Sequence, residues 1–434
     1  MRIVYTLLWW IVLPLLPLRL WWRGRREPGY RERIGERFGL YADGPQARDV
    51  VWIHAVSLGE TRAVAPLIER LQRELPGRTI LLTHMTATGR EAGRALFGDR
   101  VVQAWLPYDF PFAMKRFVAQ FRPRTGLLVE TELWPNLTAM AARSGTTLLL
   151  VNARLSERSA RAYGRVPSLS RPLFRALAGT AAQSDADAGR LRHLGARDVV
   201  VTGNLKFDIA IPPHARAEAD AMRARFGVGR PVLVLASTRD GEEALLLDAL
   251  ARATLPSATL VVIVPRHPQR FDAVAALLDA RRVPYARRSA NAPVDTSARV
   301  VLGDSLGEMT AYYGAADVAF VAGSLLPLGG QNLIEAIAAG VPTLIGPHMF
   351  NFQQASDAAV AASAAVRIRD ADDVFATAAR LFADAGERER MRASAESFIA
   401  AHRGAIDRLW TWLAPRLAAA DETSRAGPTR ATGG

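Results

Sequence analysis

Acidic residues that could take up a proton stand directly after predicted strands. Glu60 follows the apolar stretch 50–53 through the loop 54–59, at the point where a helix begins. The helix dipole favours an ionised carboxylate in the first turn by about 0.3–1 kcal/mol, and an ionised carboxylate can accept a proton. Acids are also common at helix starts because they stabilise them, so capping explains Glu60 as readily as catalysis.

A second acidic cluster follows the stretch 125–129. Glu130 and Glu132 are two residues apart, so they lie on the same side of the chain if the extended pitch continues. Paired carboxylates in a cleft need cationic or donor groups beside them. Capping is the alternative, since Glu132 and Pro135 both suit the start of a helix.

A lone lysine and a short acidic motif complete the candidates in the first half. Lys206 follows the stretch 199–202 near the predicted cleft, although most lone lysines are solvated surface residues. Asp185 and Asp187 form a DxD string like the metal motif of some sugar transferases. Ser184 precedes a helical run there, which favours capping. We therefore predict no catalytic metal.

Three loops in the second half suit an anion, and they are 236–240, 264–268 and 303–309. In the second loop, prolines flank Arg266 and His267, which fixes the backbone and aims two donors at one place. The third loop opens a helix, whose free amides suit a phosphate. Each loop alone could be an ordinary turn, but three at the same end of successive strands favour a ligand.

A glycine-rich stretch from Gly323 to Gly340 is the strongest of these signals. Glycines let a backbone approach a ligand closely. Asn332 and Glu335 are one helical turn apart, so their side chains can point to one spot, and an acid there suits ribose hydroxyls. A capping box formed by the same two residues is the alternative, and both roles are compatible.

The elements that must position these residues alternate between strands and helices. Predicted strands are 50–53, 80–83, 101–105, 125–129, 147–151 and 199–202, then 231–236, 259–264, 299–302, 318–321 and 342–345. Helical stretches such as 61–75, 89–96 and 111–120 lie between them. This alternation predicts parallel sheets in an α/β fold. Two Rossmann-like domains facing a cleft would bind ligands at the carboxyl ends of their strands, where the candidate residues fall.

Length and composition set the outer limits. A chain of 434 residues favours two domains. The net charge of +13 attracts anionic partners, of which nucleic acid is the weakest option because the basic residues are spread out and no recognition motif is present. With no cysteine, the chain has no disulfide, thiolate zinc site or cysteine nucleophile.

The N-terminus predicts a membrane-anchoring helix. Residues 3–18 carry no charge, and the apolar stretch resumes after Arg19, giving about 30 Å of helix. Trp21 to Arg26 follows instead of small residues, which disfavours a signal peptide. Arginines cluster after the stretch, so the body should lie on the cytoplasmic side of the membrane. Pro14 and Pro17 weaken the helix, which leaves a segment lying in the interface open as well.

The predicted organisation has five parts, divided at the proline-rich segment 209–214. They are a membrane anchor at 1–26, a Rossmann-like domain at 27–208, a linker at 209–230, a second Rossmann-like domain at 231–417 and a disordered tail at 418–434.

Taken in order, several strings of this sequence resemble the 3-deoxy-D-manno-octulosonic acid (Kdo) transferases of lipopolysaccharide biosynthesis. The strings are Gly35–Gly39, His54–Glu60, Leu106–Asp109, Glu130–Asn136, Asn152–Ser156, Gly203–Asp208, Pro265–Pro268 and Gly346–His348. The resemblance runs from the N-terminus to about residue 410 and implies the GT-B fold. It also implies an N-terminal domain that binds the acceptor and a C-terminal domain that binds the nucleotide sugar.

The resemblance implies transfer of Kdo from CMP-Kdo to a lipid A precursor, lipid IVA, with inversion and without metal or other cofactor. Glu60 matches the general base, and Glu130 and Lys206 match positions that support the transition state. The residues matching the CMP-contacting loops are Arg266, His267, Gly307, Glu308, Met309, Asn332, Leu333, Ile334 and Glu335. The sequence departs from the family pattern at Gln331, Leu333 and Arg239, where His, Pro and His are expected.

Two other functions fit parts of the sequence. Another GT-B transferase or a nucleotide-sugar epimerase using UDP would share the glycine-rich loops, although a soluble epimerase needs no anchor. A non-catalytic protein that binds the membrane surface would use the same positive charge. Stabilisation by CMP would separate the first from a Kdo transferase, and the effect of Glu60→Ala on transfer would separate the second.

Overall fold

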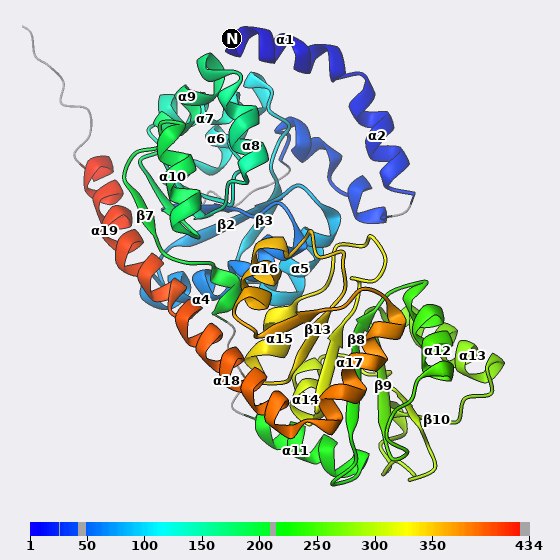
Figure 1. The fold of residues 1–434 in the computed structure, drawn as a ribbon. Coiled ribbons are helices and arrows are strands. Elements are labelled where there is room, and N and C mark those ends of the chain that lie inside the picture. The colour runs from blue at the N-terminus through cyan, green and yellow to red at the C-terminus, as the bar shows by residue number, and fades with distance from the viewer. Residues whose placement is uncertain (26, 42–48, 209–213, 426–434) are drawn as a thin grey trace, which may run out of the picture. The chain divides into compact units, whose positions relative to one another are not determined.

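Each half of the chain folds into a parallel sheet covered by helices (Figure 1). The computed structural model describes residues 1–25, 27–41, 49–208 and 214–425. It divides into two compact units: unit 1 comprises Met1–Asp208 and Gly404–Gly434, and unit 2 comprises Ile209–Arg403. Arg26, the end of the predicted anchor, and most of the proline-rich segment, 209–213, lie outside the described residues.

The seven strands of unit 1 are all parallel, in the order β3-β2-β1-β4-β5-β6-β7. They are β1 (Val50–His54), β2 (Thr79–His84), β3 (Val102–Trp105), β4 (Thr125–Val129), β5 (Thr147–Ala153), β6 (Gly179–Ala182) and β7 (Val199–Val201). Every residue of β1 and β4 is buried, as expected for strands covered on both faces. The strand order reverses between these two neighbours, so the loops that carry Glu60 and Glu130 leave the sheet at its switch point.

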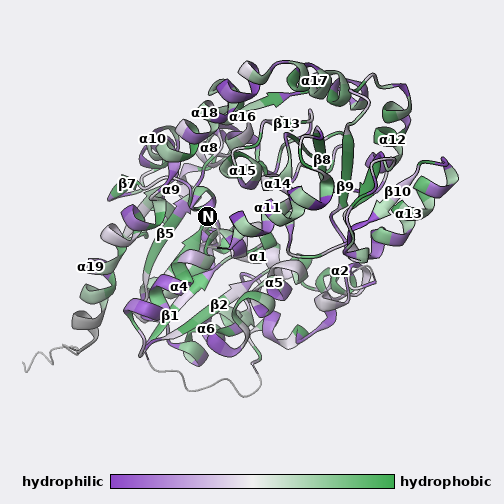
Figure 2. Cartoon of the chain, turned by 90° about the horizontal axis from the view of Figure 1, so that it is seen from below, coloured by the Kyte–Doolittle hydropathy of each residue, from purple (hydrophilic) through white to green (hydrophobic). Residues whose placement is uncertain are grey.

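The helices of unit 1 cover both faces of this sheet. They are α3 (Leu58–Ala63), α4 (Ala65–Glu74), α5 (Ala87–Phe97), α6 (Pro111–Phe121), α7 (Pro135–Ser144), α8 (Glu157–Gly164), α9 (Pro167–Arg175), α10 (Asp185–His193) and α19 (Ala405–Arg425), with 3-10 turns η1 (Pro28–Arg31), η2 (Ile34–Phe38), η3 (Gly98–Arg100) and η4 (Leu205–Phe207). The single helix predicted over 61–75 is two helices that meet at Val64. Figure 2 shows the apolar residues concentrated in the strands, whereas the helices carry both apolar and polar residues.

The C-terminal helix corrects two predicted boundaries. Helix α19 belongs to unit 1 and not to the domain predicted at 231–417. The Asp208 carboxylate accepts hydrogen bonds from the backbone N–H groups of Gly404, at 2.7 Å, and Ile406, which fixes the start of the helix. Leu413 and Leu417 are buried against the unit 1 core. The helix continues to Arg425 through three alanines, residues with high helix propensity, so the tail predicted from 418 is helical over its first residues.

Unit 2 repeats the architecture with strand order β10-β11-β9-β8-β12-β13-β14. Its strands are β8 (Val232–Thr238), β9 (Leu260–Pro265), β10 (Tyr285–Arg287), β11 (Val300–Leu302), β12 (Val318–Val321), β13 (Thr343–Ile345) and β14 (Ala365–Arg367). Its helices are α11 (Ala215–Phe226), α12 (Glu242–Arg252), α13 (Phe271–Ala280), α14 (Met309–Ala315), α15 (Leu333–Ala338), α16 (Gln353–Ala361), α17 (Ala371–Ala383) and α18 (Ala385–His402), with 3-10 turns η5 (Pro268–Arg270) and η6 (Arg288–Ala290).

The segment predicted as a linker is largely helical. Helix α11 occupies 215–226 and packs on α14, where its Ala219 meets Gly314 closely. Met222 and Phe226 are buried at helical spacing, and this burial gives the segment a place in the unit 2 core. The linker prediction for 209–230 is therefore wrong over α11.

The N-terminal apolar stretch forms two helices, α1 (Arg2–Val12) and α2 (Leu15–Arg23). Among the described residues, no single helix combines the length and the apolar character needed to cross a membrane, whereas α1 and α2 together meet that requirement by length and composition with a bend of 61° between them. The bend falls at Pro14, in keeping with the predicted weakening of the helix by proline.

Candidate active site

The Glu60 carboxylate is held by the loop that precedes its own helix. Ser57 caps α3, its hydroxyl oxygen accepting from the Glu60 backbone N–H at 3.4 Å. The same hydroxyl donates to Glu60 Oε1 at 2.9 Å, and the Val56 backbone N–H donates to Oε2 at 2.7 Å. The capping alternative is therefore correct, and it fixes the orientation of the carboxylate. Each oxygen still has acceptor capacity for a further proton donor.

Burial makes Glu60 a stronger base than an ordinary glutamate. The residue is 8% exposed, and its pKa is raised to about 8, chiefly by burial and in addition by the charges of Glu130 and Glu132. The hydrogen bonds from Val56 and Ser57 oppose this rise because they favour the ionised form. A base whose pKa lies close to the operating pH combines adequate ionisation with a strong drive to take up a proton.

Glu130 and Lys206 form an ion pair in the same unit. Lys206 Nζ lies 3.1 Å from Glu130 Oε1, and both side chains are about one-fifth exposed, at 20% and 24%. Glu130 directly follows β4 with a φ of +62°, a left-handed conformation that is uncommon for a residue with a Cβ. Such strain gathers at functional sites. The structure thus brings together the three residues that the sequence assigned to catalysis.

Two ionisable residues, Glu132 and His54, lie near the cluster formed by Glu60, Glu130 and Lys206. Burial also raises the pKa of Glu132, and Glu130 adds to the rise, while the Trp134 indole N–H donates to Glu132 at 3.2 Å. His54 contacts the Trp134 ring edge-on at 5.9 Å. Burial and the nearby His84 lower the pKa of His54 to about 3, so its imidazole is neutral at physiological pH and does not compete with Glu60 as a base.

The DxD string caps a helix, as predicted. The Ser184 hydroxyl oxygen accepts from the Asp187 backbone N–H at 3.2 Å. Asp187 is buried, and its Oδ1 accepts from the Leu155 N–H and from Arg190 Nη2, each at 2.9 Å. Within the described part of the chain, no three histidine, aspartate or glutamate side chains are placed so that they could hold a metal ion.

Two of the predicted anion loops of unit 2 meet side by side. The Arg266 backbone N–H donates to the Thr238 carbonyl at 2.9 Å, which joins the loop after β9 to the loop after β8. Partial burial lowers the pKa of His267, and Arg239 and Arg266 lower it further by charge repulsion. Positive charge and hydrogen-bond donors, which a phosphate ligand requires, are therefore gathered in one region by Arg239, Arg266 and His267.

The third loop leads into helix α14, as predicted, and its backbone is uncrowded at Gly307. Gly307 has a φ of +80° and no atom within 4 Å of where a Cβ would stand. Glu308 precedes α14, and its Oε1 pairs with Arg288 Nη2 at 2.7 Å, so this carboxylate is already engaged. Met309 is the first residue of α14. A ligand at this turn would meet backbone groups rather than the Glu308 carboxylate.

Asn332 and Glu335 form a cap that differs in detail from the predicted box. Asn332 Oδ1 accepts from the Ile334 N–H at 3.1 Å, and Asn332 Nδ2 donates to Glu335 Oε1 at 2.9 Å. Glu335 thus contacts the side-chain amide and not the backbone. Leu333 and Ile334 have fully buried side chains, so only their backbone groups can reach a ligand.

Glu242 is a site residue that the sequence analysis missed. Its side chain is fully buried at the start of α12. Oε1 accepts from the backbone N–H groups of Ser324 and Leu325, both at 2.9 Å, and Oε2 accepts from those of Gly323 at 2.7 Å and Arg239 at 3.1 Å. One carboxylate thereby ties the loop after β8 to the loop after β12.

The sequence holds one signal for this role. Glu242 and Glu243 stand four residues before Leu246 and Leu247, so helical periodicity places all four on the buried face. The network continues to a third loop, because the Gly346 N–H donates to the Ser324 hydroxyl at 2.9 Å. The three loops after β8, β12 and β13 therefore form one connected structure.

Comparison with known proteins identifies the family. The model of the 3-deoxy-D-manno-octulosonic-acid transferase (kdotransferase) family matches residues 32–209. A 3-deoxy-D-manno-octulosonic acid transferase from Bordetella pertussis is 47% identical over 433 residues, covering 95% of this chain and 99% of the relative. The chain belongs to the Kdo transferase family. It is therefore a glycosyltransferase, and the family resemblance drawn from the sequence strings is confirmed.

Solved structures confirm the two-sheet fold of this Kdo transferase family member. A glycosyltransferase from Rickettsia africae has a TM-score of 0.54 at 11% identity, covering 86% of this chain and 98% of that chain. A UDP-GlcNAc 2-epimerase from Neisseria meningitidis also has a TM-score of 0.54, at 14% identity, covering 84% of this chain and 100% of that chain. Transferases and epimerases thus share the fold, and sequence identity distinguishes them here.

Proposed function

We propose that the protein transfers Kdo from CMP-Kdo to the lipid A precursor lipid IVA, with inversion at the anomeric carbon and Glu60 as the general base. The observation that carries this proposal is the fixed, buried Glu60 carboxylate with its pKa raised to about 8, beside the Glu130–Lys206 ion pair. The 47% identity to a Kdo transferase along nearly the whole chain supports the choice of sugar.

The reaction is a single displacement. Glu60 takes the proton of the acceptor hydroxyl while the hydroxyl oxygen forms a bond to the anomeric carbon of Kdo. The bond from that carbon to the phosphate oxygen breaks, and CMP leaves with the electron pair. Attack from the side opposite the leaving group inverts the configuration.

Different groups serve the two ends of this displacement. CMP leaves as a stable phosphate anion, so its departure needs positive charge and hydrogen-bond donors rather than an acid. Arg266 supplies the charge, and His267, whose pKa is lowered, supplies a neutral N–H donor. Lys206 offers a second positive charge, held in place by Glu130. No step in this scheme requires a metal ion or another cofactor.

The proposed location is the cytoplasmic face of the inner membrane, where the acceptor lipid and the anionic leaflet are both present. Apolar side chains on α1 and α2 are exposed, among them Ile3, Leu8, Ile11 and Trp22. The arginines follow this stretch rather than precede it, which supports a cytoplasmic body.

The test is incubation of the purified full chain in detergent with CMP-Kdo and lipid IVA, followed by mass spectrometry of the lipid. Lipid IVA carrying Kdo, formed equally with and without a chelator, is the expected product. Absence of lipid-linked Kdo, or conversion of a UDP-sugar without transfer, would reject the proposal. Loss of activity with the chelator would reject the metal-independent mechanism.

A further inference from the structure

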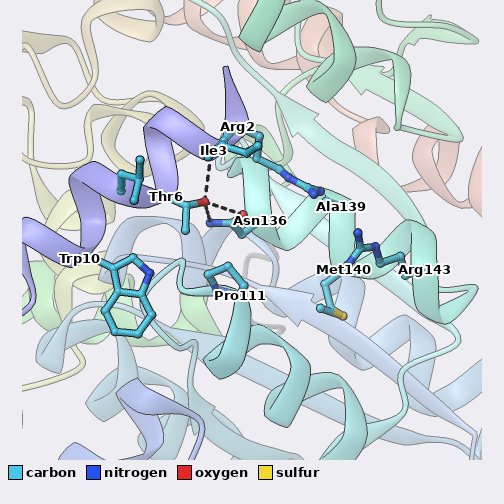
Figure 3. Close-up of a pocket in the computed structure, with 10 residues that line it drawn as sticks. Arg2, Ile3, Thr6, Trp10, Pro111, Asn136, Ala139, Met140 and Arg143 are labelled. Atoms are coloured by element: carbon cyan, nitrogen blue, oxygen red, sulfur yellow. Dashed lines mark hydrogen bonds between the residues drawn. The ribbon is translucent and has the colours of Figure 1, made fainter.

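A groove of about 220 Å³ lies in unit 1 between α1 and α7 (Figure 3). Leu7 and Trp10 of α1 form one wall, and Ala139 and Met140 of α7 form the other. This volume is below the ~300–1,000 Å³ typical of pockets for drug-sized ligands. The groove therefore suits a single narrow apolar group rather than a whole glycolipid.

Hydrogen bonds hold the two walls together. The Asn136 side-chain amide at the start of α7 donates to the Thr6 hydroxyl of α1 at 3.1 Å and to the Asp109 carbonyl at 2.7 Å. The Asp109 carboxylate in turn accepts from the backbone N–H groups of Asn136, at 2.9 Å, and Leu137, at 2.8 Å. Trp9 packs its ring against Phe110 at 5.4 Å. Helix α1 is thus fixed against unit 1, and the groove is a built feature.

One end of the groove is positively charged. Arg2 and Arg143 both line it, and none of the described residues that line it is acidic. However, the buried Asp109 carboxylate lies behind Asn136 and interacts with Arg2. Figure 3 shows both guanidinium groups on the α7 side, away from the Trp10 ring. Two arginines with fork-shaped donors are well suited to a phosphate group.

The groove also borders an exposed apolar surface. Ile3 is 75% exposed and Leu7 57% exposed where they border the groove, and this surface continues along α1 and α2 through Ile11, Leu15 and Leu18. Exposed apolar patches of this kind mark sites that contact lipid or protein. An apolar slot beside two cations matches an anionic lipid, whose acyl chain would fill the slot and whose phosphate would contact the cations.

We propose that this groove binds an anionic phospholipid of the bilayer, with one acyl chain between α1 and α7 and the phosphate on Arg2 and Arg143. The proposal rests on the membrane location given under the proposed function. Asn136 lies in the first turn of α7, directly after the loop that begins with Glu130, so a bound lipid would reinforce the contact between α1 and α7 next to that loop.

The test is a titration of the full chain in detergent with single-chain phosphatidylglycerol, followed by native mass spectrometry. Phosphatidylcholine with the same chain is the reference ligand. We expect tighter binding of the glycerol lipid, and a loss of ~10-fold or more in its affinity in the double variant Arg2→Gln/Arg143→Gln, because charge-assisted contacts disappear. The double variant Arg158→Gln/Arg171→Gln removes the same charge from exposed positions on α8 and α9 and should bind normally.

A steric variant tests the apolar slot separately. Ala139→Leu fills the groove and should abolish binding of the acyl chain, whereas Ala142→Leu, at an exposed position on the same helix, should not. Equal affinity for the choline lipid, or an unchanged affinity in the Ala139 variant, would overturn the proposal. Displacement of the phospholipid by lipid IVA would also overturn it, by assigning the groove to the acceptor. Because the assay contains no CMP-Kdo, its outcome is independent of whether the protein transfers Kdo.

Discussion

Replacing Glu242 with glutamine tests how the loops of unit 2 that are proposed to bind CMP are held. The native carboxylate accepts four backbone hydrogen bonds in a fully buried position. Glutamine keeps one acceptor oxygen, and its amide group points N–H donors at two backbone N–H groups. Two hydrogen bonds to a charged acceptor are lost, each worth about 1.5–3 kcal/mol, so the free energy of unfolding should fall by about 3–6 kcal/mol.

The assay is differential scanning calorimetry together with CMP titration. For a domain of 150–250 residues, ~1 kcal/mol shifts Tm by about 2–4 °C, so the unit 2 transition should fall by roughly 6–24 °C. The affinity for CMP should also decrease at temperatures where the variant is folded, because Arg239 and the backbone at Gly323 lose their common anchor. A loss of ~1.4 kcal/mol in these contacts weakens binding tenfold.

The neighbouring Glu243 provides the matched control. It is equally buried, but it contacts the side chains of Thr238 and Arg270 and no loop backbone. Arg270 retains its ion pair with Asp240 when Glu243 is changed to glutamine. The Glu243→Gln protein should therefore lose less stability and keep its CMP affinity. Equal effects of the two substitutions on CMP binding would refute the assignment of Glu242 as the residue that positions these loops.

Four further outcomes follow from the same geometry. The transfer rate should rise ~10-fold per pH unit up to about pH 8, the raised pKa of Glu60, and a flat profile from pH 6 to pH 8 would contradict this. Because the pKa of Glu60 is raised in the folded state, the free energy of unfolding should decrease as the pH rises from 4.5 to about 8. Calorimetry should find a weaker pH dependence in Glu60→Gln. Lys206→Met should lower kcat by ~10²–10³ in steady-state assays, as expected when one charge-stabilising group is removed, and an unchanged kcat would argue against that role. Gly346→Ala would place a Cβ 2.3 Å from the Ser324 carbonyl oxygen and should destabilise the protein by about 1–3 kcal/mol in chemical denaturation, whereas Gly189→Ala, with open space around it, should not.

The sequence predicts the central strands because they are buried on both faces and consist of apolar, β-branched runs. Strand β6 is the exception within the first sheet: its residues, Gly179 to Ala182, include two alanines and a glycine and give little strand signal. The short strands β10 and β14 lie at the sheet edges, where partial burial leaves a weak pattern. The placement of α19 with unit 1 depends on Asp208, a contact between segments far apart in the chain, so local pattern cannot give it.

The proposed catalytic cluster is more predictable than the loops proposed to bind the nucleotide. Glu60 and Glu130 lie in the loops that follow two neighbouring strands, β1 and β4, at the switch point of the sheet. Because these strands are adjacent, the two residues are expected to lie close together. Glu242 gave no such signal in isolation, because an acid at a helix start is normally solvated and its burial here depends on amides from Gly323 to Leu325. The buried side chains of Leu333 and Ile334 likewise depend on the packing of α15.

The most direct test of the proposed mechanism is the single-turnover transfer rate of Glu60→Gln, measured with CMP affinity on the same protein. Glutamine keeps the size of the side chain and an oxygen that can accept from Ser57 or Val56, but it cannot accept the proton of the acceptor hydroxyl. The mechanism predicts a rate lower by ~10²–10⁴ with CMP affinity unchanged. A rate within a few-fold of the native value would contradict the role of Glu60 as the base.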